Sequence, residues 1–257
     1  MKPEIQVLYV EDSPAYARLV RHALAGRPDV RLVVATGGLG GLELARRDPP
    51  TLILLDRHLP DLDGDEVLAR LRSWPEMSTV PVVMITADDA AADVDRLLAA
   101  GASGCLTKPI EPAALLDLVD GRLPQVHRPT RDAGAERGAT HPAGEELVDD
   151  QVLAGLRRLV AVSPDGDLDG LLGAFTRETR SRIAQLHRAV AAGDVAGVAT
   201  VAHTIIGSSA SFGAIRIAQG ARDLQALANE GDLAAAGAVV ERLEADLVRT
   251  TAALGIR

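Results

Sequence analysis

Aromatic residues are scarce in this chain of 257 residues, where Phe, Tyr and Trp together make up 2%. Proteins that bind single-stranded nucleic acid stack the bases on aromatic side chains, and contact with a phosphate backbone needs clustered Lys or Arg. The chain has no block of basic residues, and its formal net charge is −9. We therefore expect no nucleic acid among its partners.

Cysteine and long apolar runs are also lacking. Cys105 is the single cysteine, so no disulfide can form within the chain. The first residues, MKPEIQVLYVEDS, contain too short an apolar run for a signal peptide, and no apolar stretch approaches the roughly 18 residues of a membrane span. We expect a soluble, cytoplasmic protein with no membrane partner.

The first part of the chain alternates short aliphatic runs with amphipathic stretches. The predicted strands are Ile5–Val10, Arg31–Ala35, Thr51–Leu55, Val80–Ile85 and Ser103–Thr107. The predicted helices are Ser13–Ala25, Gly38–Arg47, Asp63–Ser73, Asp88–Ala100 and Glu111–Gly121. Such alternation is typical of an α/β domain whose parallel sheet is covered by helices on both faces. We assign this domain to residues 1–122.

A change of composition separates this domain from an all-helical region. Residues 123–146 lose apolar periodicity and are rich in Pro, Gly, Arg and Ala, which predicts a flexible linker. From there to the end, residues 147–257, helices are predicted at Asp149–Ala161, Leu168–Ala192, Val195 to about Phe212, Ile215–Ala228 and Leu233–Leu254. Their lengths and short turns predict an antiparallel four-helix-bundle domain.

Polar residues follow the predicted strands of the first domain. Glu11-Asp12, Asp56, Thr86 and Lys108 each stand at or just after a strand end. In an open parallel sheet the ligand site forms beyond the carboxyl ends of the strands, so these side chains are expected to converge. Clustered carboxylates repel one another unless a cation lies between them, and hard oxygen ligands favour Mg²⁺. An aspartate in such a site can attack a phosphoryl group, which a lysine and a hydroxyl would help to neutralise.

Each of these features also has a plainer explanation. Glu11 and Asp12 fit the start of a helix capped by Ser13, because acidic residues favour helix N-termini. Asp56 fits a turn-rich loop, and Lys108 followed by proline fits a strand terminator. The order of all of them at successive strand ends favours the phosphoryl site.

Four segments of this domain, VEDSP, LLDRHLPDLDG, MITA and CLTKPI, resemble the signature segments of response-regulator receiver domains, over residues 4–121. The resemblance implies a doubly wound, flavodoxin-like sheet of order 2-1-3-4-5. It further implies that Asp56 is the phosphoacceptor, and that Asp12, Asp56 and the backbone carbonyl of His58 bind Mg²⁺, with Glu11 acting through a water molecule. Thr86 would be the switch hydroxyl and Lys108 the amine that pairs with the phosphoryl group.

Two places bear on how such a receiver would signal. Cys105 stands where the family usually has an aromatic switch residue. The family's usual coupling of a movement of Thr86 to a rotamer change of that aromatic side chain is therefore in question. His58 and Asp88 stand where the family flanks the attacking water, and we hypothesise that they tune the lifetime of the phosphoryl group.

The segment AHTIIGSSASFGA, residues 202–214, lies on a predicted helix of the second domain. His203 and Gly207 are four residues apart and share a helix face, so an open patch lies beside the imidazole. A histidine on a helix face is more often structural, but this segment and the helices around it resemble a histidine-containing phosphotransfer (HPt) domain. The resemblance implies that His203 carries phosphate and that Gln225 lies beside it. The family's lysine, three residues after the histidine, is replaced by Ile206, and Arg222 is a candidate substitute.

Together the two resemblances predict a two-component phosphorelay protein rather than an ATP-dependent kinase. Asp56 would accept phosphate from a histidine kinase, and His203 would exchange it with a receiver domain, its own or a separate one. Two alternatives remain open: phosphorylation of Asp56 gates binding by an inactive HPt-like bundle, or hydrolysis at Asp56 makes the chain a phosphate sink.

Overall fold

The computed structural model describes residues 5–86, 91–121, 146–163 and 166–256. The predicted linker, apart from residue 146, and Asp88 therefore lie outside the described residues. The chain divides into two compact units, with the division between residues 142 and 143. In the part of the chain that is described, no helix has the length and apolar character needed to cross a membrane.

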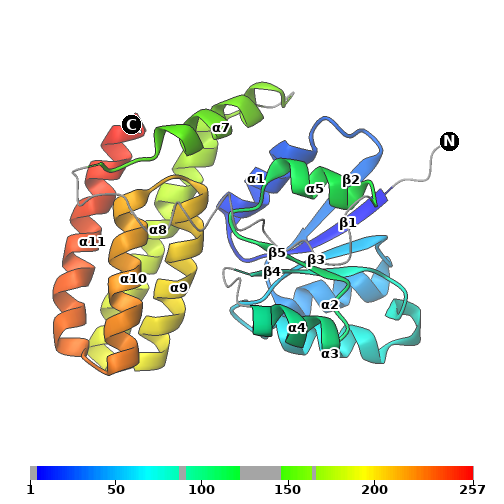
Figure 1. Ribbon diagram of the computed structural model, residues 1–257, viewed down its shortest axis with the longest axis horizontal. Coiled ribbons are helices and arrows are strands. Elements are labelled where there is room, and N and C mark those ends of the chain that lie inside the picture. Colours follow the sequence, from blue (N-terminus) through cyan, green and yellow to red (C-terminus); the bar gives the residue numbers. More distant parts are fainter. Residues whose placement is uncertain (1–4, 87–90, 122–145, 164–165, 257) are drawn as a thin grey trace. The chain divides into compact units, whose positions relative to one another are not determined.

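The first unit is a five-stranded parallel sheet of order β2-β1-β3-β4-β5. Its strands are β1 (Ile5–Val10), β2 (Val30–Ala35), β3 (Leu52–Asp56), β4 (Val82–Thr86) and β5 (Gly104–Thr107). The helices are α1 (Pro14–Leu24), α2 (Gly38–Arg47), α3 (Gly64–Ser73), α4 (Ala91–Ala99) and α5 (Pro112–Val119), with a 3₁₀ turn, η1, at Pro75–Met77. Helices α1 and α5 cover one face of the sheet, and α2, α3 and α4 cover the other (Figure 1). The predicted doubly wound fold and strand order are confirmed.

Small shifts at the strand ends matter for the site. Strands β3 and β4 each run one residue further than predicted, so Asp56 and Thr86 are their last residues. Strand β4 begins at Val82 rather than Val80, because Pro81 has no N–H to donate to a neighbouring strand. Asp56 lies beside Ile85 in the sheet register, and Thr86 lies beside Thr107. The polar side chains are thus held by the ends of paired strands.

Two apolar layers enclose the sheet. One lies between the sheet and α2, α3 and α4 and includes Cys105, which is 3% exposed. Trp74 packs against this layer. The other lies on the α1 and α5 face and includes Tyr9. Strands β3 and β4 are buried on both faces, which explains why their sequences are continuously aliphatic.

The second unit consists of helices. They are α7 (Asp150–Ala161), α8 (Leu168–Ala192), α9 (Val195–Ser211), α10 (Ile215–Glu230) and α11 (Leu233–Ala253). Short turns separate these helices, and Gly193 and Gly231 end α8 and α10 in the left-handed conformation, with φ of 71° and 76°. Asp194 and Asp232 then cap the next helices through their side chains.

Four of these helices, α8 to α11, form the predicted bundle, in which α9 packs along α10 and α8 packs against both α9 and α11. Helix α7 is an additional helix that packs on α8. The chain's two phenylalanines, Phe175 and Phe212, stack in the bundle with ring centroids 4.7 Å apart. This stack fixes α8 against the end of α9, the helix that carries His203.

Candidate functional site

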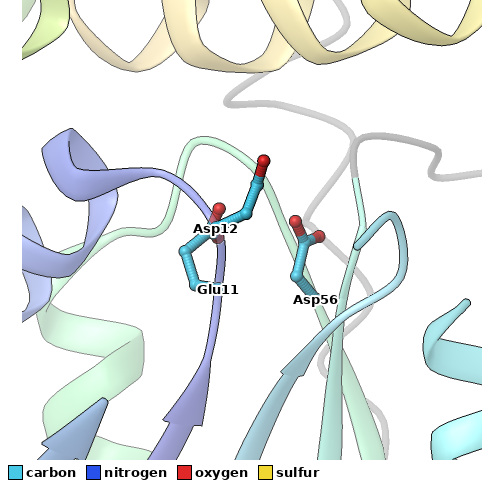
Figure 2. Close-up of side chains that lie close together, drawn as sticks. All are labelled: Glu11, Asp12 and Asp56. Carbon is cyan, nitrogen blue, oxygen red and sulfur yellow. The ribbon is translucent and has the colours of Figure 1, made fainter. Parts of the chain in front are cut away.

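Three acidic side chains meet beyond the carboxyl ends of β1 and β3. Glu11 and Asp12 follow β1 directly, and Asp56 ends β3 (Figure 2). Each offers a carboxylate oxygen, and these oxygens lie within 4.8 Å of one another. Glu11 is 1% exposed and Asp56 is 4% exposed. The predicted convergence of these carboxylates at one end of the sheet is therefore present in the structure.

Lys108 brings a positive charge into this group from the end of β5. Its Nζ lies 2.9 Å from Glu11 Oε2 and 3.1 Å from Asp56 Oδ2. Its backbone N–H donates to the Thr86 carbonyl at 2.8 Å, which holds the lysine beside the end of β4. One ammonium ion thus bridges the two most buried carboxylates of the cluster.

Both tyrosines of the chain lie at this pocket. The Tyr9 hydroxyl donates to Glu11 Oε2 at 2.8 Å, and the Lys108 Nζ lies 4.3 Å from the centroid of the Tyr16 ring. The N–H of Ser13 donates to the other Glu11 oxygen at 3.2 Å. Neither tyrosine was singled out from the sequence. A signal for Tyr9 was present: it stands two residues before Glu11, and side chains two apart in a strand point to the same face.

The charge balance of the pocket is visible in its pKa shifts. Burial, followed by the nearby charge of Asp56, raises the pKa of Glu11 from 4.5 to about 7, against the opposing effect of Lys108. Burial also raises the pKa of Asp56. Burial alone would lower the pKa of Lys108, but Glu11 and Asp56 outweigh it and raise that pKa. The three carboxylates are therefore short of positive charge, and a divalent cation that takes oxygen ligands fits this donor set.

The loop between β3 and α3 is fixed at both of its ends. The N–H of Gly64 donates to the Arg57 carbonyl at 2.8 Å, and a Cβ at Gly64 would lie 2.3 Å from the Asp56 carbonyl oxygen. The Asp61 carboxylate accepts from the backbone N–H groups of Gly38 and Leu39 at 2.7 and 3.0 Å. Asp61 thereby caps α2, which has no side-chain cap of its own.

His58 lies within this anchored loop, two residues after Asp56. Burial, together with the neighbouring charge of Arg57, lowers the pKa of its imidazole. The side chain is therefore neutral near physiological pH. Its backbone carbonyl, the predicted third ligand of the cation, belongs to a segment whose course is set by Asp61 and Gly64.

Thr86 and Cys105 occupy the positions expected to transmit a change at Asp56. Thr86 is 1% exposed at the end of β4. Cys105 lies beside Met84 in the sheet and faces the apolar core, and burial raises the pKa of its thiol to about 11. The residue is thus a small buried apolar group.

His203 lies on α9 in the second unit and is partly exposed. The Gln225 amide on α10 approaches its Nδ1 to 3.3 Å, so the predicted pairing of these two residues is present. Gly207, one turn after His203, is buried, which differs from the open patch predicted beside the imidazole. The candidate substitute for the missing lysine, Arg222, is exposed, and its guanidinium lies 3.5 Å from the Gln219 side chain.

Comparison with known proteins covers both units. The model of the response regulator receiver domain matches residues 7–120, and the model of the Hpt domain matches residues 170–253. The sensor histidine kinase AruS of Pseudomonas aeruginosa is 31% identical over 223 residues, which are 86% of this chain and 21% of that protein. A stretch of that length in this chain includes both Asp56 and His203.

Two further relatives match the first unit. The transcriptional regulatory protein CseB of Streptomyces avermitilis is 33% identical over 156 residues, 58% of this chain and 65% of that protein. A solved receiver domain of the sensor histidine kinase PA1611 from Pseudomonas aeruginosa, with a magnesium ion in its active site cleft, is 27% identical. It covers 46% of this chain and 95% of its own, with a TM-score of 0.42. The chain thus spans less than two thirds of the length of CseB and of AruS.

Proposed function

Because the chain belongs to the response regulator receiver and Hpt families, we propose that it is a phosphorelay protein in which Asp56 and His203 carry the phosphoryl group. The observation that carries the proposal is the position of the Lys108 ammonium, 2.9 Å from Glu11 and 3.1 Å from Asp56 in a pocket of three carboxylates. An aspartate with a cationic partner at this distance is equipped to receive PO₃ and to have its new charge neutralised.

The proposed step at Asp56 is a phosphoryl transfer. A carboxylate oxygen of Asp56 bonds to phosphorus while the bond from phosphorus to the donor, an imidazole nitrogen of a histidine kinase or the acyl oxygen of acetyl phosphate, breaks. Lys108 would follow the transferred phosphoryl group, and the Thr86 hydroxyl would donate a hydrogen bond to one of the phosphoryl oxygens. Asp12, Asp56 and the His58 carbonyl would hold Mg²⁺, and Glu11 would act through a water molecule. When bound, the ion neutralises the acidic pocket and the incoming oxygens.

The proposed step at His203 needs a lone pair on Nε2. An amide can present either its oxygen or its nitrogen to a neighbour. The Gln225 amide nitrogen is the atom placed 3.3 Å from Nδ1, and Nε2 is buried in this conformation. With the amide turned so that its oxygen faces Nδ1, the imidazole proton would stay on Nδ1, which would donate to the amide, and Nε2 would carry the lone pair that attacks phosphorus. Gln225 would thus select the reactive tautomer of His203. We infer that a receiver domain, the chain's own or a separate one, is the exchange partner.

The test uses the full chain, labelled either with acetyl phosphate or with a histidine kinase. Acyl phosphate is lost in alkali, whereas phosphohistidine is lost in acid. We expect wild-type protein to carry alkali-labile label that disappears in Asp56→Asn, and acid-labile label that disappears in His203→Gln. The matched controls are Asp63→Asn, in the same loop as Asp56, and His187→Gln, an exposed histidine on α8. Label that survives in Asp56→Asn and His203→Gln alike would overturn the assignment.

One observation favours a second candidate function. Ile206 leaves α9 without a charged side chain other than His203 when that histidine is protonated. A phosphoryl group on His203 would therefore lack the positive charge of the family's lysine. The lysine would not be needed in a bundle that only docks to a partner, or in a chain that drains phosphate through Asp56. Alkali-labile label under every donor, with no acid-labile label, would favour the gated binding module or the phosphate sink.

A further inference from the structure

We propose that Tyr9 is a positioning residue for phosphotransfer, because its hydroxyl holds Glu11 when Lys108 turns from Glu11 to the phosphoryl group on Asp56. This inference rests on the proposed function of Asp56. It assigns a task to a tyrosine that neither bonds to phosphorus nor is expected to contact the metal ion.

One Glu11 oxygen has two partners in the pocket. Oε2 accepts from the Tyr9 hydroxyl at 2.8 Å and lies 2.9 Å from the Lys108 ammonium. The other oxygen, Oε1, accepts from the Ser13 N–H at 3.2 Å. Because Glu11 is 1% exposed, bulk water cannot replace a donor that is withdrawn from it.

Lys108 in turn serves two acceptors. The same Nζ lies 3.1 Å from Asp56 Oδ2, the carboxylate that receives the phosphoryl group. A phosphorylated Asp56 places additional charged oxygens beyond that carboxylate, and an ammonium that follows them moves away from Glu11. Glu11 Oε2 then keeps the Tyr9 hydroxyl as its donor. Without that hydroxyl, a buried carboxylate oxygen would lose the donor that the protein itself supplies just as the transfer takes place.

Tyr9 itself is held rigidly. The side chain is fully buried in the apolar layer on the α1 and α5 face, and its backbone pairs with Val34 of β2 and Leu54 of β3. Its hydroxyl is therefore held at a fixed place relative to the strand ends. Burial, followed by the charge of Glu11, raises the pKa of Tyr9, so the hydroxyl keeps its proton and remains a donor.

The experiment compares wild-type protein with Tyr9→Phe, in the full chain and at saturating Mg²⁺. One readout is the rate of labelling by acetyl phosphate as its concentration is varied. The other is the affinity for beryllofluoride, a mimic of the phosphoryl group, followed by fluorine NMR. Because outer-shell hydrogen bonds at metal sites are worth roughly 10- to 100-fold, we expect the maximal labelling rate and the beryllofluoride affinity of Tyr9→Phe to fall by about tenfold or more. KM for acetyl phosphate is expected to change little, since the bond matters only once Lys108 has moved.

Two comparisons separate positioning from a general loss of stability. Ser103→Ala removes a hydroxyl that accepts from the Val82 N–H at 3.2 Å, at the opposite end of the same sheet. It is expected to match wild type in both readouts. In a Lys108→Met background no ammonium leaves Glu11, so adding Tyr9→Phe is expected to change beryllofluoride affinity by less than about twofold.

The outcomes distinguish this inference from the proposed function. If wild-type protein takes no alkali-labile label and Asp56→Asn changes nothing, the proposed function fails. If wild type is labelled at Asp56 but Tyr9→Phe equals it in maximal rate and beryllofluoride affinity, the positioning role alone is overturned. The role is also overturned if Tyr9→Phe is equally harmful with and without Lys108.

Discussion

The acidic pocket is expected to make the metal-free protein less stable as the pH rises. Burial raises the pKa of Glu11 from 4.5 to about 7, so folding favours its protonated form. The stabilisation is complete below the unfolded-state pKa and is lost as the pH rises through the folded-state value. One pKa unit corresponds to about 1.4 kcal/mol, so the full effect is about 3 kcal/mol. Roughly 2 kcal/mol of it falls between about pH 5.5 and pH 8.

The chain offers a local probe for this measurement. Trp74, the single tryptophan, lies at the end of α3 against the core of the first unit, so its fluorescence reports the unfolding of that unit. The assay is urea unfolding without divalent cations, with Glu11→Gln as the matched variant. The lowered pKa of His58 has the opposite sign, but His58 is present in both proteins and cancels in their difference.

We expect the stability of wild type relative to Glu11→Gln to fall by about 2 kcal/mol from pH 5.5 to pH 8, or roughly 1 M in the urea midpoint. Replacing Glu11 also removes a negative charge that repels the Asp56 carboxylate. The difference in unfolding free energy between the two proteins therefore includes a contribution from both carboxylates. Mg²⁺ is expected to raise the wild-type midpoint much more at pH 8 than at pH 5.5, because protons compete for its ligands. A difference that stays flat or rises with pH would refute this account of the pocket.

Three further predictions concern single side chains. Asp61→Ala removes the cap of α2 and is expected to destabilise the first unit by about 1 kcal/mol, measured by Trp74 fluorescence in urea. Cys105 is buried with its thiol pKa raised to about 11, so Ellman's reagent at about pH 8 should react with it only as the unit unfolds; rapid reaction in native protein would contradict this. Ile206→Lys places a cation one turn from His203 and is expected to lengthen the lifetime of acid-labile label by roughly two- to fivefold.

The fold was largely predictable because local signals agree with its topology. β1, α2 and α8 have the predicted bounds. A β-branched run marks β1, Gly37 precedes α2, and the caps Asp167 and Gly193 flank α8. The differences arise where contacts across the sheet decide the boundary, as at Asp56 and Thr86, which the neighbouring strands draw into the ladder. Helix α10 likewise continues to Glu230, two residues beyond the prediction, because its chain turns only at Gly231.

The candidate site was predictable where topology alone brings residues together. Glu11 and Asp12 follow β1, Asp56 ends β3 and Lys108 follows β5, so their convergence depends only on strand order. The contacts of Tyr16 and Asp61 depend instead on how α1 and α2 pack, which no spacing in the sequence reveals. Arg222 shows the same limit: it has the right charge and helix, yet Gln225 is the α10 side chain that contacts Nδ1 of His203.

The two proposed phosphoryl carriers differ in the charge that surrounds them. At Asp56 the Lys108 ammonium is already in place, and the oxygen donors of the pocket suit a divalent cation. At His203 the helix supplies no cation, because Ile206 replaces the family's lysine. A phosphoryl group carries about two negative charges near neutral pH, so these surroundings favour Asp56 more strongly than in a relative that keeps the lysine. Ile206→Lys should therefore raise the share of label on His203 when both sites can exchange it, and an unchanged share would show that the surrounding charge does not set the balance.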